Sequence, residues 1–206
     1  MMIIELRMYQ LKPGTVPQFK ERFSASLPHR QKFSALGGFF HTEVGVLNKV
    51  IHFWPYESFE ARLKARAAAV APGQWPPATR EFAVHQENEL FLPAPFCPKP
   101  EPRQLGGLYE ICIDQYAAGA IPGVIERWST TIAERVKLSP LAAAWYTEIG
   151  ALNKWVHIWA YKDAAERQRI HADMETRRAW PPASPPGALL KSENMLVVPA
   201  SFSPLR

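Results

Sequence analysis

Cysteine is scarce in this chain: there are two in 206 residues, Cys97 and Cys112. They lack the spacing of a metal-ligand pair, and they do not occupy equivalent places in the repeat described below. The sequence therefore argues against a disulfide framework and against a metal site. We expect two reduced thiols in a cytoplasmic protein.

Long hydrophobic runs are also missing. No apolar stretch approaches the roughly 18 residues that a membrane span requires. The first residues, MMIIELRMYQL, reach Glu5 and Arg7 where a secretory signal would need an uninterrupted apolar segment. These features predict a protein with no membrane partner.

Charge and motif content exclude further classes of function. The net charge is +5, but acidic residues are interspersed with the basic ones, so the basic face typical of nucleic-acid binding is not expected. There is no P-loop, dinucleotide fingerprint, H-E-x-x-H or G-x-S-x-G motif. We therefore expect no nucleic-acid partner and no bound cofactor.

What the chain does contain is an internal repeat. Residues 41–62 and 146–167 share ten identical positions out of 22 at a constant offset of 105, with the common pattern T-E-x-G-x-L-N-K-x-x-H-x-W-x-Y. The match extends outward to paired Glu5 and Glu110, and to Trp-Pro-Pro at 75–77 and 180–182. Such a repeat determines the architecture before any local assignment does.

Each copy has the pattern of a ferredoxin-like β-α-β-β-α-β unit. In the first copy, alternation predicts strands near 3–9, 39–44, 50–56 and 85–92, and helices after Gly14 and over 58–70. Asn48 and Asn153 suit turn positions with left-handed backbone. We predict repeat 1 over 1–98, a proline-rich linker over 99–104 and repeat 2 over 105–206.

Alternation also divides each strand into two faces. In the third strand of each copy, His52, Trp54 and Tyr56, or His157, Trp159 and Tyr161, share one face. Exposing these rings would cost roughly 1.5–3 kcal/mol each. We therefore predict a single α+β barrel in which the two sheets face each other and these aromatic-polar faces lie inside.

These blocks resemble the NIPSNAP family. The first copy carries E-L-R-x-Y-x-L-K-P-G at 5–14, the central block at 42–56 and Q-E-N-E-L-F-L-P-A-P-F at 86–96. The second copy keeps the central block but has Cys112 and Asp114 in place of Arg7 and Tyr9. The resemblance implies the fold of the dimeric α+β barrel superfamily, which includes cofactor-free monooxygenases, haem enzymes and small lyases and isomerases. It supplies no catalytic residue.

His52 and His157 are the only histidines at matching positions, and we interpret them as candidate acid/base groups. Glu43 and Glu148 are their candidate orienting partners. The alternatives are a histidine that only joins the sheets by a hydrogen bond and a glutamate that only holds the hairpin.

The remaining candidate ligand contacts are Glu5, Arg7, Tyr9, Trp54, Tyr56, Trp159 and Tyr161. Copy one has an arginine beside a phenol where copy two has none, and an arginine fork suits a carboxylate. An anionic or carbonyl-bearing ligand is therefore expected to prefer copy one.

Three functions remain open at this point. The first is a small-molecule-binding barrel, such as a cofactor-free oxygenase- or isomerase-like enzyme acting on an apolar or aromatic substrate. The second is a binding or assembly protein with a structural core, including a homo-oligomer. The third is a haem-binding barrel with a histidine as axial ligand.

Overall fold

The computed structural model describes residues 1–177 and 180–206, and its two halves repeat one β-α-β-β-α-β order. Repeat 1 comprises β1 (Ile3–Leu11), α1 (Val16–Gln31), β2 (Gly38–Val44), β3 (Lys49–Tyr56), α2 (Phe59–Val70) and β4 (Ala83–Pro93), with a short 3-10 helix over Arg80–Phe82. Repeat 2 comprises β5 (Leu108–Tyr116), α3 (Ile121–Arg135), β6 (Leu141–Ile149), β7 (Lys154–Tyr161), α4 (Ala164–Arg177) and β8 (Leu189–Pro199).

Local chemistry explains several of these boundaries. Ser58 begins α2 as its N-cap, and its hydroxyl accepts a hydrogen bond from Ala61 N at 3.1 Å. Asn48 and Asn153 have φ angles of 59° and 62°, which confirms the left-handed turns predicted for both hairpins. The connection between the repeats runs from the end of β4 at Pro93 to the start of β5 at Leu108.

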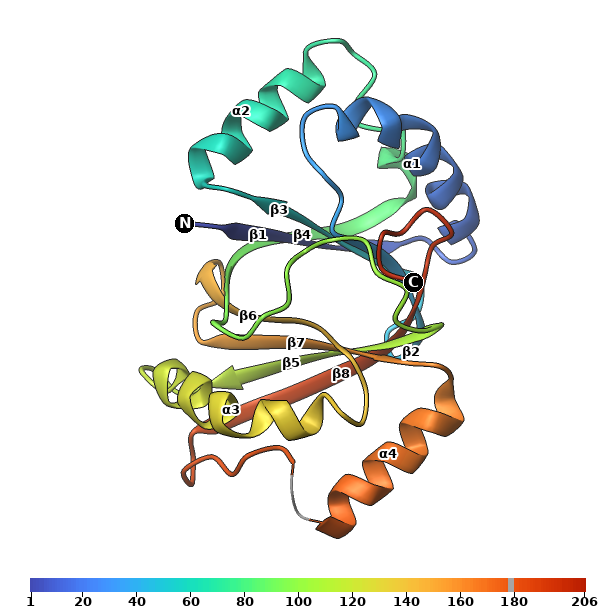
Figure 1. Cartoon of the computed structure of the whole chain (residues 1–206). Helices are drawn as coiled ribbons and strands as arrows, with labels where there is room; N and C mark the ends of the chain where they lie inside the picture. Colours follow the sequence, from blue (N-terminus) through green and yellow to red (C-terminus); the bar gives the residue numbers. More distant parts are fainter. Residues whose placement is uncertain (178–179) are drawn as a thin grey trace.

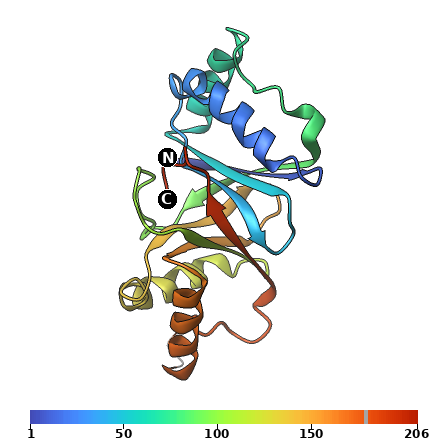
Figure 2. The same cartoon turned by 90° about the vertical axis from the view of Figure 1, so that its right-hand side faces the viewer.

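The strands close into one barrel within a single chain. Their order is β1-β3-β2-β8-β5-β7-β6-β4, and every pairing is antiparallel. The last strand of each repeat crosses to the other repeat: β4 pairs with β6, and β8 pairs with β2. Figure 1 shows α1 and α2 on the outer side of the repeat 1 strands, with α3 and α4 on the opposite outer side of the molecule; Figure 2 shows the same two outer layers after a quarter turn.

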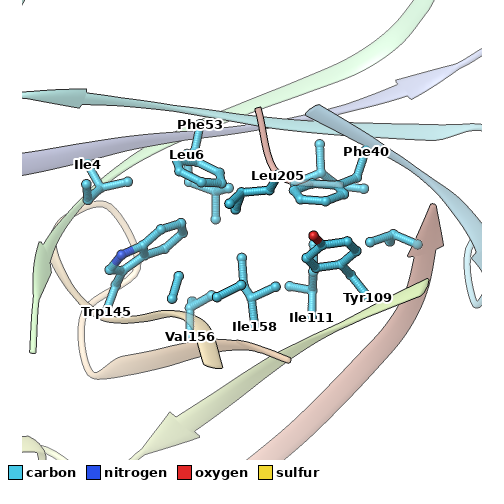
Figure 3. Close-up of a cluster of buried hydrophobic side chains, with 14 of the residues drawn as sticks. Ile4, Leu6, Phe40, Phe53, Tyr109, Ile111, Trp145, Val156, Ile158 and Leu205 are labelled. Atoms are coloured by element: carbon cyan, nitrogen blue, oxygen red, sulfur yellow. The ribbon is translucent and has the colours of Figure 1, made fainter. Parts of the chain in front are cut away.

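The barrel interior is filled mainly by aliphatic side chains. Figure 3 shows Ile4, Leu6, Phe53, Val156 and Ile158 converging between the two sheets. The prediction that the aromatic-polar faces lie inside was therefore wrong. His52, Trp54 and Tyr56 belong to the outer face of the sheet, beneath the helices.

Charge and ring packing explain this orientation. The outer face carries Glu5, and cations from α2 reach it there, whereas the interior cluster consists of hydrophobic side chains. Burying a carboxylate without such partners costs several kcal/mol. Phe19 and Phe23 on α1 supply aromatic partners for the same face. Trp54 and Trp159 are each only 2% exposed in the single chain, but they are covered by helices.

Membrane insertion through helices is not supported by the described part of the chain. Within residues 1–177 and 180–206, no helix combines the length and the apolar character needed to cross a bilayer.

Candidate functional site

A cavity of about 240 Å³ lies between the outer face of the repeat 1 sheet and its helices. Strands β1 and β3 form its floor, and the Trp75-Pro76-Pro77 loop forms part of its rim. Its aromatic and charged lining residues include Tyr9, Phe19, Phe23, Trp54, Trp75, Glu5, Arg7, Arg30, Arg66 and Arg80. Four arginines against one carboxylate give this cavity an excess of positive charge.

Glu5 is the buried anion at the base of the cavity. Its side chain receives hydrogen bonds from Arg7 Nε at 3.0 Å, Arg62 Nη2 at 2.8 Å and Arg66 Nη1 at 3.0 Å. Burial by itself raises the pKa of Glu5, but the nearby arginines outweigh this and lower it to about 2. Glu5 is thus ionised at neutral pH and already committed to these cations.

A second set of contacts fixes the aromatic wall. Tyr56 Oη donates to Glu5 Oε2 at 3.2 Å and accepts a hydrogen bond from Arg30 Nη2 at 2.6 Å. The Arg30 guanidinium lies 4.9 Å from the Trp54 ring centroid, within the range of a cation–π interaction. Arg7 donates to the hydroxyl of Tyr9 through Nη1. The arginines therefore connect the floor of the cavity to its aromatic wall.

His52 is held in a single tautomer. Trp54 Nε1, which can only donate, makes a hydrogen bond to His52 Nδ1 at 2.8 Å. Burial, and then the charge of Arg7, lower the pKa of His52 to about 3, so its ring is neutral at physiological pH. A neutral imidazole that accepts at Nδ1 carries its proton on Nε2.

The His52 Nε2–H group is an unused donor. It is buried, and it finds no acceptor among the residues that the structure describes. Buried donors are nearly always paired in folded proteins, and an unpaired one costs about 1–3 kcal/mol. An acceptor atom on a ligand in the cavity would remove this cost.

The same tautomer argues against the haem hypothesis for these histidines. An axial ligand offers a lone pair on one ring nitrogen while the other nitrogen donates its proton to a neighbour. In His52 and His157 the Nδ1 lone pair is taken by Trp54 Nε1 and Trp159 Nε1, each at 2.8 Å. Their Nε2 atoms are protonated, so these side chains do not fit an iron atom.

Repeat 2 builds the same framework around Glu110. Tyr161 Oη donates to Glu110 Oε2 at 3.2 Å, and Arg135 Nη2 lies 3.2 Å from the same phenol oxygen. Arg167 and His171 reach Glu110 from α4, as Arg62 and Arg66 reach Glu5 from α2. Burial raises the pKa of Glu110, but hydrogen bonds from His171 and Arg167 lower it to about 2.

The two repeats differ beside the histidine. In repeat 2 the carboxylate of Asp114 lies 3.5 Å from His157 Nε2 and accepts a hydrogen bond from Ser192 Oγ at 2.6 Å. Trp128 stands where repeat 1 has Phe23, and its ring centroid is 4.8 Å from that of His157. A cavity of about 360 Å³ between α3 and α4 is lined by Arg135 and Trp180, the counterparts of Arg30 and Trp75, and by Thr131, Leu138 and Met174, but not by His157. In repeat 2, His157 Nε2 thus faces a carboxylate that belongs to the same chain.

The structure brings most of the predicted residues together but separates them by repeat. The cavity is lined by Glu5, Arg7, Tyr9, His52 and Trp54. Tyr56 donates a hydrogen bond to Glu5. His157, Trp159 and Tyr161 form the corresponding framework of repeat 2. Glu43 and Glu148 are exposed near the ends of β2 and β6, and in the described part of the chain neither contacts these histidines.

Sequence reasoning identified Arg7 but missed the other cations of the site. Arg30 and Arg62 recur at the repeat offset as Arg135 and Arg167, so the periodic identities could have identified them. Arg66 and Arg80 carry no such signal, because repeat 2 has His171 and Pro185 at those places. Only the packing of α2 and of the following loop on the sheet shows that they face the cavity.

Comparisons with known proteins agree with this architecture. The NIPSNAP family model matches residues 4–98 and 109–204, one match to each repeat. Human protein NipSnap homolog 3A is 30% identical over 216 aligned positions, which cover 98% of this chain and 85% of the human protein. A monooxygenase-like protein from Lactobacillus acidophilus superposes with a TM-score of 0.65 at 8% identity over 96% of this chain and 93% of its own. A chlorite dismutase-like protein superposes with a TM-score of 0.53 at 10% identity over 97% and 95%. The last two show the dimeric α+β barrel fold alone.

Proposed function

The chain belongs to the NIPSNAP family, and from that premise we propose that its repeat 1 binds a small anionic or carbonyl-bearing molecule with an apolar or aromatic body. One observation carries the proposal: His52 lines a cavity of excess positive charge, and its buried Nε2–H lacks an acceptor among the described residues. We also propose that the protein is cytoplasmic, in keeping with its two free cysteines.

In this proposal His52 acts as a neutral hydrogen-bond donor. With a pKa near 3, this ring neither stores nor releases a proton near pH 7, so it is poorly suited to the acid/base role predicted from the sequence. A neutral imidazole can instead polarise a carbonyl or hold a carboxylate oxygen. Arg7 stands two residues from Tyr9 on β1 and supplies charge to the same cavity. An oxygenase- or isomerase-like reaction would use this donor to stabilise negative charge on the bound molecule.

Binding of two defined probes tests this proposal. Phenylacetate provides an aromatic body with an anion, and acetophenone provides one with a carbonyl. Calorimetry should show saturable binding of at least one probe, with fluorescence changes from Trp54 and Trp75. Arg7→Ala and His52→Gln should each weaken binding about tenfold or more, as expected for loss of a charge-assisted or buried hydrogen bond.

Arg169→Ala is the matched control, because Arg169 is an exposed arginine of repeat 2 with a side chain that is 74% exposed. It should leave affinity unchanged. Binding that is absent for both probes, or that falls equally in Arg169→Ala and Arg7→Ala, would refute a site in repeat 1.

Self-association is a second candidate function, favoured by apolar side chains at the hairpin turns. Val46 and Leu47 in one hairpin, and Leu152 in the other, are 61%, 55% and 59% exposed. Val46 and Leu47 are consecutive at one hairpin tip, and exposed apolar side chains that lie together often mark association sites. We propose a second copy of this chain as the partner. Sedimentation of the purified protein over a range of concentrations tests this.

A further inference from the structure

The side chain that most clearly distinguishes the two repeats is the one beside the histidine on the first strand. Tyr9 on β1 and Asp114 on β5 occupy equivalent positions: each pairs with the strand that carries the histidine and with the last strand of its repeat. The Tyr9 ring packs edge-on against His52, with centroids 5.2 Å apart, and its hydroxyl is bound to Arg7. In the described part of the chain, no hydrogen bond joins Tyr9 to His52 Nε2.

Asp114 makes the contacts that are unfilled in repeat 1. Its Oδ2 faces His157 Nε2 at 3.5 Å, and its Oδ1 accepts from Ser192 Oγ at 2.6 Å. Burial by itself raises the pKa of Asp114, but contacts with His157 and Ser192 outweigh this and lower it, so the carboxylate is ionised. The two oxygens are held by one side chain from β7 and one from β8.

Both of these donor positions exist in repeat 1. His52 corresponds to His157, and it is locked in the same tautomer by Trp54 as His157 is by Trp159. Gln86 on β4 lies opposite Tyr9 in the register where Ser192 on β8 lies opposite Asp114, and Gln86 lines the cavity. A side-chain amide provides N–H donors, as a hydroxyl provides one.

We propose that Asp114 is a built-in substitute for the ligand of repeat 1, and that this ligand is a carboxylate whose two oxygens are received by His52 and Gln86. The inference rests on the proposed function and narrows its ligand to a carboxylate. Arg7, absent from repeat 2 where Cys112 replaces it, supplies the counter-charge for an anion that arrives from solution. Repeat 2 needs no such cation, because its carboxylate is the side chain of Asp114 in the same chain.

The first experiment removes the Asp114 carboxylate by substitution and adds formate as a free carboxylate. Asp114→Ala in the full chain should lower the melting temperature by roughly 3–8 °C, because it leaves the buried Nε2–H of His157 without its carboxylate and removes the partner of Ser192 Oγ. Sodium formate should restore at least half of this loss, whereas sodium chloride at equal ionic strength should not. Asp114→Asn keeps the position filled and should respond to formate no more than the wild type does.

Formate that stabilises Asp114→Ala no better than chloride, or that stabilises wild type, Asp114→Asn and Asp114→Ala equally, would overturn the inference. The imidazole signals of His157, assigned with His157→Gln, should move with formate in Asp114→Ala only. This readout reports on repeat 2 and does not depend on any ligand of repeat 1.

The second experiment addresses repeat 1. Phenylacetate should bind at least tenfold more tightly than acetophenone, and Gln86→Ala should weaken phenylacetate about fivefold or more without weakening acetophenone. Equal affinity for the two probes would overturn the carboxylate assignment while leaving a ligand site in repeat 1 intact. Absence of both interactions, combined with successful formate rescue, would refute the proposed function instead.

Discussion

Repeat 1 and repeat 2 contain the same buried framework but differ in what lies beside the Nε2 atom of its histidine. Both place a glutamate, a tyrosine and a tryptophan around an imidazole held in one tautomer. Repeat 1 adds arginines and leaves the imidazole proton unused, whereas repeat 2 places a carboxylate beside it and a larger ring over it. After duplication, one copy can keep an open site while the other is closed by its own side chains.

The largest expected difference between the repeats concerns their buried glutamates. Glu5→Gln leaves Arg7, Arg62 and Arg66 without their shared carboxylate, and breaking a buried ion pair on one side costs about 3–5 kcal/mol. Glu110→Gln should cost less, because Arg167 is the one arginine bound to Glu110 in the described part of the chain, whereas three arginines bind Glu5. Urea unfolding at pH 7 measures both; a larger loss for Glu110→Gln would contradict the charge comparison.

Lowering the pH should reveal the next effect, a loss of stability caused by the depressed pKa of His52. Its folded pKa of about 3 lies below the ordinary value of 6.5, so the unfolded chain takes up this proton first as pH falls. The stabilisation is complete above pH 6.5 and is lost progressively as the pH falls toward 3. Between pH 6.5 and 5.5, before Glu5 begins to protonate in the unfolded chain, we expect a loss of about 1 kcal/mol.

His52→Gln should remove that part of the pH dependence. Urea unfolding of the variant and the wild type at several pH values isolates it, because the other histidines contribute equally to both curves. Parallel curves would show that His52 does not titrate differently in the folded and unfolded states.

Exchanging the ring over the histidine should make repeat 1 resemble repeat 2. Phe23→Trp adds volume where Trp128 fills repeat 2, so phenylacetate binding should weaken about tenfold, or about 1.4 kcal/mol. Calorimetry with phenylacetate checks this, and a thermal melt confirms that the variant folds. Unchanged affinity would place the ligand away from α1.

The smallest effects are expected at the hairpin turns. Leu47→Lys and Leu152→Lys change exposed side chains, so each should alter the free energy of unfolding by no more than about 0.5 kcal/mol. If these turns join two copies, either substitution should shift the sedimentation coefficient toward that of the monomer. A shift for one variant alone would assign the interface to one repeat.

The repeat, the order of its elements and the family can all be inferred from the amino-acid sequence alone. These features depend on local patterns: alternation along β1 and β3, a capping serine at position 58, left-handed asparagines at 48 and 153, and identities at an offset of 105. The first three can be read from neighbouring residues, and the identities from an alignment of the chain with itself. The pairing of two such units into a closed barrel follows from their need to cover a second face.

The face that points inward and the residues that share the cavity are known only from the folded chain. Alternation separates Leu6 from Arg7, but it does not tell which of them the helices cover; that depends on Arg62 and Arg66, which reach Glu5 across more than fifty positions. The contrast between Tyr9 and Asp114 is visible in the sequence, but its meaning depends on the histidine that each one faces. A side chain's partner is set by strand register and helix packing, and these are properties of the folded chain as a whole.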